Sequence, residues 1–343
     1  MTPSPVTPYM TYPTSAKQTL CLTLATVLLS CAAAQASAHA YTAQLKAKKF
    51  DEVDKATQTA LAANPANVEA LLGRVDLLLS MHQESKLDEA VRLAEQCIEA
   101  APTRSECHEY LGNALGTKAI NAGILSAMGS LGKIRNSFKK AVELDPKNMD
   151  ARFSLLQYYQ QAPGIVGGGK GNARELVAQT LPINADASKL MQASVDLADK
   201  EFAKVETAVQ MPLPADPYDL QDRQRELMMS LGSTYVREKK NADALRIFAD
   251  MQKRFPDSEL GAFGAGRAYQ EQGKYTDAIA QFEKALGIKA TAPMHFRLGQ
   301  SWQALNDKPK AIAAYEKALA FKPELGKKQR EDAQEQLKTL KTG

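Results

Sequence analysis

A pattern that recurs about every 34 residues constrains the fold of this chain more than any other feature. Each of three consecutive copies has a glycine that is followed three positions later by an aromatic residue. A small residue and then a second aromatic residue follow at fixed distances. The copies align as Gly232, Tyr235, Ala244 and Phe248, then Gly266, Tyr269, Ala278 and Phe282, then Gly299, Trp302, Ala311 and Tyr315. Gly73 and Gly112 mark two less regular copies earlier in the chain.

The spacing within each copy predicts two helices joined by a turn. Apolar residues fall at i, i+3, i+4 and i+7, which keeps one side of each helix apolar. The glycine of the first helix and the alanine of the second would let the two backbones approach closely. A single helix pair cannot bury its apolar side alone, so successive pairs must stack. The pattern therefore predicts an all-α solenoid, and no alternating stretch is long enough to argue for a β-sheet.

On these residues the chain resembles the tetratricopeptide repeat proteins. The resemblance implies a right-handed superhelix of helix-turn-helix units with a C-terminal capping helix. For function it implies that the protein binds other proteins. A second resemblance rests on Tyr158-Tyr159-Gln-Gln-Ala-Pro-Gly-Ile-Val-Gly-Gly-Gly-Lys170 and on the long third repeat counted from the N-terminus, residues 105–148. These features are similar to a set of exported bacterial tetratricopeptide proteins without an assigned activity.

The repeats divide the chain into five predicted regions. Residues 1–38 form an export signal, and residues 39–210 form an N-terminal region of stretched and degenerate repeats. Three clean repeats occupy residues 225–325, after a linker at 211–224 that contains three prolines. Residues 326–343 form a polar capping helix, which a solenoid needs to cover its last apolar surface.

The first residues have the composition of a secretory signal. Lys17 precedes an apolar run from Leu20 to Leu29, and Ala36-Ser37-Ala38 offers a small-residue cleavage site. The apolar run is shorter than the roughly 20 residues that span a bilayer. We therefore expect export to the periplasm of a bacterial cell. The segment that ends in Cys31 also resembles a lipobox, and lipidation of Cys31 would instead anchor the protein to the outer membrane.

Two cysteines, Cys97 and Cys107, remain after the predicted cleavage. In repeat register Cys97 lies late on one helix and Cys107 lies early on the next, and these two helices stack. An exported protein enters an oxidising compartment, where an even number of cysteines favours a disulfide. The alternative is that both are small buried residues at positions that alanine would also fill.

The segment from Gly164 to Lys170 matches the spacing of a phosphate-binding loop but lacks two of its requirements. A hydroxyl residue for Mg²⁺ should follow the lysine, and the chain has Gly171 there. The preceding residues predict a helix where the motif needs a strand. We therefore interpret the segment as a turn in which glycines adopt backbone angles closed to other residues. It is also a candidate contact loop for an anionic group, formed by Gly167, Gly168, Gly169 and Lys170.

The sequence contains no pattern of catalysis or of cofactor binding. Its four histidines do not have the spacing of metal ligands, and no G-x-S-x-G nucleophile motif is present. The formal net charge is +4 with basic and acidic residues interleaved, which does not favour nucleic-acid binding. We therefore expect a protein that is not an enzyme and that uses neither a cofactor nor a metal.

The candidate binding surface is the side of the first helices that such solenoids turn toward their groove. An apolar column runs there beside columns of polar side chains, which suits the side chains and the backbone of an extended peptide. The alternative is that Phe263 and Phe296 merely pack between adjacent helices. The nine candidate partner-binding residues are Met229, Ser233, Val236, Phe263, Arg267, Gln270, Phe296, Gln300 and Gln303.

These observations give two hypotheses for function. The first is a non-enzymatic scaffold of the bacterial envelope that binds a partner polypeptide in its groove. The second uses the stretched third repeat, where residues 116–133 carry Ile120, Ile124, Met128 and Leu131 at helical spacing. This insertion would wall off a pocket for a lipid-like or small apolar ligand, or dock on a membrane surface. Its structural alternative is a long helix packed on its own repeat.

Overall fold

The computed structural model describes residues 39–214 and 219–342, and within these residues every regular element is a helix. The predicted export signal, including Cys31, lies outside the described residues. None of the described helices is both long enough and apolar enough to span a membrane. The α-helices are α1 (Thr42–Lys46), α2 (Phe50–Ala63), α3 (Val68–Ser80), α4 (Leu87–Ala100), α5 (Ser105–Ala122), α6 (Ile124–Leu144), α7 (Met149–Gln161), α8 (Lys170–Thr180), α9 (Ala185–Ala198), α10 (Phe202–Val209), α11 (Leu220–Arg237), α12 (Asn241–Arg254), α13 (Leu260–Glu271), α14 (Tyr275–Ile288), α15 (Ala292–Ala304), α16 (Lys308–Ala320) and α17 (Lys327–Thr342), and two 3₁₀ turns are η1 (Glu84–Lys86) and η2 (Gly164–Val166).

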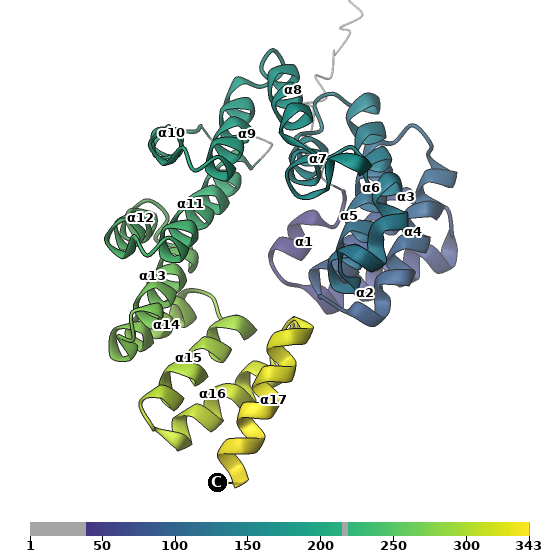
Figure 1. The fold of residues 1–343 in the computed structure, drawn as a ribbon. Helices are drawn as coiled ribbons and strands as arrows, with labels where there is room; N and C mark the ends of the chain where they lie inside the picture. The colour runs from purple at the N-terminus through teal and green to yellow at the C-terminus, as the bar shows by residue number, and fades with distance from the viewer. Residues whose placement is uncertain (1–38, 215–218, 343) are drawn as a thin grey trace, which may run out of the picture. The chain divides into compact units, whose positions relative to one another are not determined.

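The helices form successive pairs that stack along the chain (Figure 1). The three clean repeats are the pairs α11–α12, α13–α14 and α15–α16. The second helix of each pair packs against its own first helix and against the first helix of the next pair. Helix α17 packs on the last pair, where Ala333 is buried. This architecture confirms the predicted all-α solenoid.

The recurring glycines make room for the aromatic residue of a second helix. A Cβ atom added to Gly232 would lie 2.5 Å from an atom of the Phe248 ring, and one added to Gly264 would lie 2.2 Å from that ring. Phe248 is therefore held between the first helix of its own repeat and that of the next. Gly266 faces Phe282 in the same way, at 2.5 Å. The sequence pattern suggested that each glycine lets two helix backbones approach each other. In the structure, the group that lies against the glycine is instead the aromatic ring of a second helix.

Gly264→Ala should lower the free energy of unfolding by about 1–3 kcal/mol, because the added methyl group would overlap the Phe248 ring in a packed core. The matched control is Gly129→Ala in α6, where nothing lies within 4 Å of the added Cβ. Alanine at that helical position should raise the free energy of unfolding by about 0.5–1 kcal/mol. Urea denaturation measures both changes, and a stabilising effect of Gly264→Ala would contradict this packing role.

The inserted residues of the third repeat lengthen one helix pair. Helix α5 continues to Ala122 and α6 starts at Ile124, with Gly123 between them at a φ of 82°. This positive φ is open to glycine and strained for other residues. The long pair of α5 and α6 contacts α7 and borders the cavity described below.

The proline-containing segment after α10 is shorter than the linker that the sequence predicts. Helix α11 begins at Leu220, so residues 220–224 are helical. Leu220 and Gln224 are each 2% exposed, and Gln224 Nε2 donates to the Met211 carbonyl oxygen at 2.7 Å. Burial of this first turn against α9 and α10 explains the early start of the helix.

Candidate functional site

The structure separates the nine predicted groove residues into one buried residue and eight partly exposed ones. Phe296 is only 3% exposed and packs on Tyr315, with the ring centroids 6.0 Å apart. The prediction of Phe296 as a partner-binding residue is therefore wrong, because its ring fills the core between α15 and α16. The partly exposed residues are Met229, Ser233, Val236, Phe263, Arg267, Gln270, Gln300 and Gln303.

Phe263 is the aromatic residue that this surface leaves accessible. Its ring contacts Phe282 of α14, with the centroids 5.9 Å apart. The guanidinium carbon of Arg267 lies 6.0 Å from the Phe263 ring centroid, within the range of a cation–π contact. Phe263 therefore packs partly on its own repeat and presents the rest of its ring beside a cation.

Two of the predicted polar residues link neighbouring first helices. Gln270 Nε2 donates to the Arg297 carbonyl oxygen at 3.1 Å and to Ser301 Oγ at 2.9 Å, and Gln270 Oε1 accepts from Arg297 Nη1 at 3.1 Å. Gln303 Nε2 donates to Gln336 Oε1 at 2.8 Å. Gln270 and Gln303 therefore stabilise the stacking of α13, α15 and α17, so we no longer expect their amides to bind a partner's backbone.

Three arginines on successive first helices form a set that we call the arginine column: Arg237 on α11, Arg267 on α13 and Arg297 on α15. Arg267 is partly buried, and burial together with the charges of Arg297 and Arg237 lowers the pKa of its guanidinium, while Glu271 opposes this effect. Arg237 Nη2 donates to the neutral Thr234 hydroxyl at 2.9 Å. None of the three arginines forms an ion pair with a residue that the structure describes.

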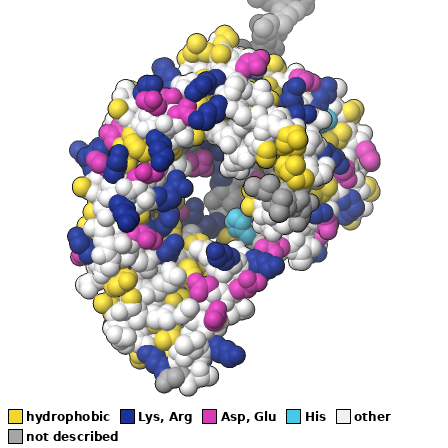
Figure 2. Space-filling model, viewed as in Figure 1, with side chains coloured by type: hydrophobic (Ala, Val, Ile, Leu, Met, Phe, Trp, Pro, Cys, Tyr) yellow, Lys and Arg dark blue, Asp and Glu magenta, His cyan; other side chains and the backbone are white. Residues whose placement is uncertain are grey.

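Elsewhere on the molecule, basic and acidic side chains are interspersed over the visible face (Figure 2). Arg246, for example, lies 2.6 Å from the Glu206 carboxylate. The arginine column differs because its charges are not neutralised in this way. Sequence reasoning singled out Arg267 and missed Arg237 and Arg297. The sequence contained a signal for both arginines. Neither has an acidic residue three or four positions away, which is the spacing at which an arginine on a helix would form an ion pair along that helix.

The glycine-rich loop uses its backbone amides internally. The amides of Gly167, Gly168 and Gly169 donate to backbone carbonyl oxygens at 2.9, 3.2 and 2.7 Å, respectively. Lys170 forms an ion pair with Asp199. The structure therefore disfavours the predicted contact loop for an anion, because the three glycine amides already have partners within the protein.

Two neighbouring helices hold this loop in a fixed conformation. Arg135 Nη1 of α6 and the Tyr158 hydroxyl of α7 both donate to the Val166 carbonyl oxygen, at 3.1 and 2.8 Å. A Cβ atom on Gly168 would lie 1.9 Å from the Ala162 carbonyl oxygen, so this position requires glycine. The distinctive loop sequence thus serves packing against α6 and α7.

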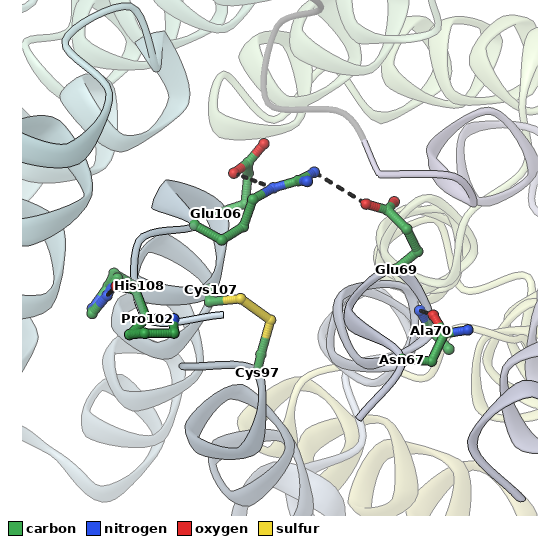
Figure 3. Close-up of a disulfide and its surroundings, with 9 residues drawn as sticks. Asn67, Glu69, Ala70, Cys97, Pro102, Glu106, Cys107 and His108 are labelled. Carbon is green, nitrogen blue, oxygen red and sulfur yellow. Dashed lines mark hydrogen bonds and ion pairs between the residues drawn. A yellow bond between two sulfur atoms is a disulfide. The ribbon is translucent and has the colours of Figure 1, made fainter. Parts of the chain in front are cut away.

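Cys97 and Cys107 form a disulfide between α4 and α5 (Figure 3). Their Cα atoms are 5.4 Å apart, which is within the normal range for this bond. Both cysteines are buried, at 1% and 0% exposure. Beside the disulfide, Arg104 bridges Glu106 and Glu69 at 2.7 and 3.1 Å, so the same turn is also held by ion pairs.

A cavity of about 610 Å³ lies along the first helices α3, α5 and α7 and is bordered by the long α5–α6 pair. Its size is within the range of small-molecule sites. Residues of the predicted insertion, among them Ala119, line it. The apolar side chains of its wall include Leu79, Tyr110, Ile120, Leu131, Ile134 and Phe138.

Asp76 is the one charged side chain among the described residues that line this cavity. Among the described residues that line it there is no Lys or Arg. The Asp76 carboxylate accepts hydrogen bonds from His39 Nε2 at 3.0 Å, from the Tyr110 hydroxyl at 3.1 Å and from Ser80 Oγ at 3.2 Å. Within the described part of the chain, no group of His, Cys, Asp and Glu is arranged to hold a metal ion. The cavity therefore suits an uncharged, mainly apolar group.

Comparison with known proteins agrees with this geometry. A tetratricopeptide repeat family model matches residues 229–293 and 263–325. Among solved structures, yeast Tom70 is similar, with 13% identity, a TM-score of 0.55 and coverage of 80% of this chain and 57% of that chain. A tetratricopeptide repeat protein from Parabacteroides merdae has 18% identity and a TM-score of 0.46, with coverage of 87% and 98%. The Cut9–Hcn1 hetero-tetramer of APC/C has 15% identity and a TM-score of 0.41, with coverage of 85% and 52%.

The comparisons define the class of the protein. The segment from 229 to 325 consists of tetratricopeptide repeats, and the likeness to Tom70 extends the fold to most of the chain. The protein is therefore an all-α solenoid of the tetratricopeptide type. No curated protein matches its sequence. Solenoids of this type generally bind other proteins and are not catalytic.

Proposed function

We propose that the protein is a non-enzymatic scaffold of the bacterial cell envelope that binds a segment of a partner polypeptide on the first helices of residues 225–325. The observation that carries this proposal is the partly exposed surface formed by Met229, Val236 and Phe263 beside the arginine column. Aromatic and arginine side chains are the commonest centres of binding energy in protein interfaces. This surface offers both kinds next to each other.

Two observations support a location in the envelope. The sequence begins with the composition of an export signal, as described above. The buried disulfide between Cys97 and Cys107 suits an oxidising compartment outside the cytoplasm. We propose the periplasm, with lipid attachment at Cys31 as the alternative that would place the protein on the outer membrane.

Phe263→Ala should reduce capture of the partner at least about tenfold, because the variant removes the accessible aromatic residue of the surface. The measurement is crosslinking of the tagged protein in the cells that produce it, followed by quantification of each crosslinked protein. Tyr275→Ala, on the second helix α14, is the matched aromatic control and should capture the partner as the wild type does. A set of crosslinked proteins that is the same in all three samples would refute binding at this surface.

The cavity beside α5 and α6 favours a second candidate function, the carriage of a lipid-like or small apolar ligand. Its volume and apolar wall suit such a ligand, and the lack of Lys and Arg among its described lining residues disfavours an anionic headgroup inside it. This function would use the inserted residues 116–133, and it does not depend on the arginine column.

Ala119→Trp should abolish binding of an apolar ligand, because the indole would fill part of the cavity that Ala119 lines. The probe is the neutral dye N-phenylnaphthylamine, whose fluorescence rises in an apolar site. Lys118→Trp, at the adjacent exposed position, is the control that adds the same side chain outside the cavity. Equal fluorescence from the wild type and both variants would exclude the cavity as a ligand site.

A further inference from the structure

We propose that the cavity beside α5 and α6 binds an amphiphilic amine, whose ammonium group meets the Asp76 carboxylate while its apolar body lies along the wall of the cavity. The proposal rests on the second candidate function, the carriage of a small apolar ligand, and names the chemical class of that ligand. It assigns a role to Asp76, the one charged side chain among the described residues that line the cavity.

The negative charge of Asp76 is not balanced by the histidine beside it. The Asp76 side chain is 24% exposed and lines the cavity. His39 Nε2 donates to Asp76 Oδ2 at 3.0 Å, while His39 Nδ1 accepts from the Tyr41 backbone N–H at 3.2 Å. An imidazole that donates at one nitrogen and accepts at the other is neutral. His39 therefore orients the carboxylate and leaves its charge in place.

The other hydrogen bonds of Asp76 also come from neutral groups. The Tyr110 hydroxyl donates to Asp76 Oδ2 at 3.1 Å, and Ser80 Oγ donates to Asp76 Oδ1 at 3.2 Å. Burial, followed by the negative charge of Asp76, raises the pKa of Tyr110 well above its usual value, so the hydroxyl stays protonated and donates. Each carboxylate oxygen has about two acceptor sites, so Oδ1 retains one for an N–H donor of a ligand.

The charges around the cavity favour a cation over an anion. The described lining residues include no Lys or Arg that would meet a negative group. Two lysines on the long helix pair, Lys118 and Lys133, form ion pairs with Asp88 and Glu95. The positive charge that would complement Asp76 must therefore come from the ligand.

The rest of the cavity provides an apolar surface for the body of the ligand. Leu131, Ile134 and Phe138 are buried wall residues of α6, and the volume of about 610 Å³ has room for an aliphatic chain. Phe138 and Tyr158 contribute aromatic rings, whose faces attract positive charge as well as apolar groups. An inorganic cation or a short polar amine would leave this wall uncovered, so the cavity favours an ammonium group that carries an apolar body.

The test compares three probes with the same chain by isothermal titration calorimetry of the purified protein: octylammonium, octanol and octanoate. Octylammonium should bind at least about tenfold more tightly than octanol, because only the ammonium forms a charge-assisted hydrogen bond with Asp76. Octanoate should bind more weakly than either, since its charge repels Asp76. Equal affinities for octylammonium and octanol would overturn the proposal, as would a preference for octanoate.

Three variants locate the bound amine. Asp76→Asn should lose the preference for octylammonium and keep the fluorescence of N-phenylnaphthylamine, which shows that the cavity is intact. Asp51→Asn, at an exposed position on α2, is the control and should keep the preference. Ala119→Trp should abolish binding of octylammonium. A preference that survives in Asp76→Asn, or binding that survives in Ala119→Trp, would overturn the proposal. The comparison of probes on the wild type decides the matter if Asp76→Asn does not fold.

A second source of an ammonium group is the headgroup of an ethanolamine phospholipid. Dihexanoyl phosphatidylethanolamine carries a phosphate next to its ammonium, and the described lining residues offer that phosphate no Lys or Arg. This lipid should therefore bind more weakly than octylammonium. Tighter binding of the lipid would assign the site to a phospholipid headgroup and overturn the proposal of an amine without phosphate.

The result is distinguishable from a failure of the second candidate function. If the neutral dye binds the wild type and not Ala119→Trp, while octylammonium binds no more tightly than octanol, the carriage of an apolar ligand stands and recognition of the amine is wrong. If neither the dye nor any of the probes binds, both are wrong.

Discussion

Between about pH 5 and about pH 8 the protein is expected to lose about 3–4 kcal/mol of unfolding free energy through the single side chain of Glu109. Glu109 is 5% exposed on α5. Burial, followed by the negative charges of Asp150 and Glu106, raises its pKa from 4.5 to about 8. A hydrogen bond from Asn148 Nδ2 to Glu109 Oε2, 2.9 Å long, and the charge of Arg223 oppose this rise.

The direction of the effect follows from proton binding in the two states. Below pH 4.5 both the folded and the unfolded chain carry the proton on Glu109. Between this value and about 8 the unfolded chain has released a proton that the folded protein keeps, so the free energy of unfolding falls as the pH rises. Above about 8 both states are ionised, and the loss is complete.

Glu109→Gln should remove this loss, so that the variant is more stable than the wild type at about pH 8 and similar to it at low pH. Urea denaturation at a series of pH values measures the difference. Glu99→Gln, at an exposed position on α4, is the control and should keep the slope of the wild type. A wild-type free energy that is constant across this range would show that Glu109 is ionised in the folded protein at neutral pH.

Cys97→Ala/Cys107→Ala should lower the free energy of unfolding by about 3 kcal/mol. The disulfide closes a loop with a sequence separation of 10, and its loss gives conformational freedom back to the unfolded chain. Alanine should fit both buried positions, so most of the effect should come from the lost crosslink. Denaturation with and without a reductant provides the control.

Reduced wild-type protein should unfold at the same urea concentration as the double alanine variant, and the reductant should not affect the variant. If the oxidised wild type and the variant were equally stable, the disulfide would contribute nothing. A further loss in the variant on adding reductant would show that the reductant acts elsewhere on the protein.

The sequence determined the fold because the repeat is a local property. Gly232, Gly266 and Gly299 recur with the same apolar spacing around them, and each such unit must stack on the next to bury its apolar side. The order and the stacking of the helices could therefore be predicted without knowledge of any contact between residues far apart in the sequence. The length of the third repeat was visible for the same reason, and the pocket predicted beside residues 116–133 corresponds to the cavity that Ala119 and Leu131 line.

The tertiary structure decided which of these residues are accessible. Phe263 and Phe296 occupy the same position in their repeats, three residues before the glycine, yet one is partly exposed and the other is 3% exposed. The sequence from Gly164 to Lys170 resembles a phosphate-binding loop. In the folded protein, however, the backbone amides of Gly167, Gly168 and Gly169 already donate hydrogen bonds to carbonyl oxygens.

The same holds for the arginines. Arg246 is paired with Glu206, a residue 40 positions earlier, whereas Arg267 has no ionic partner among the described residues. Exposure, hydrogen bonding and charge pairing depend on side chains that neighbouring repeats contribute from tens of residues away. The periodic pattern determines how the repeats stack, and only the stacked structure determines what each surface still has free to bind.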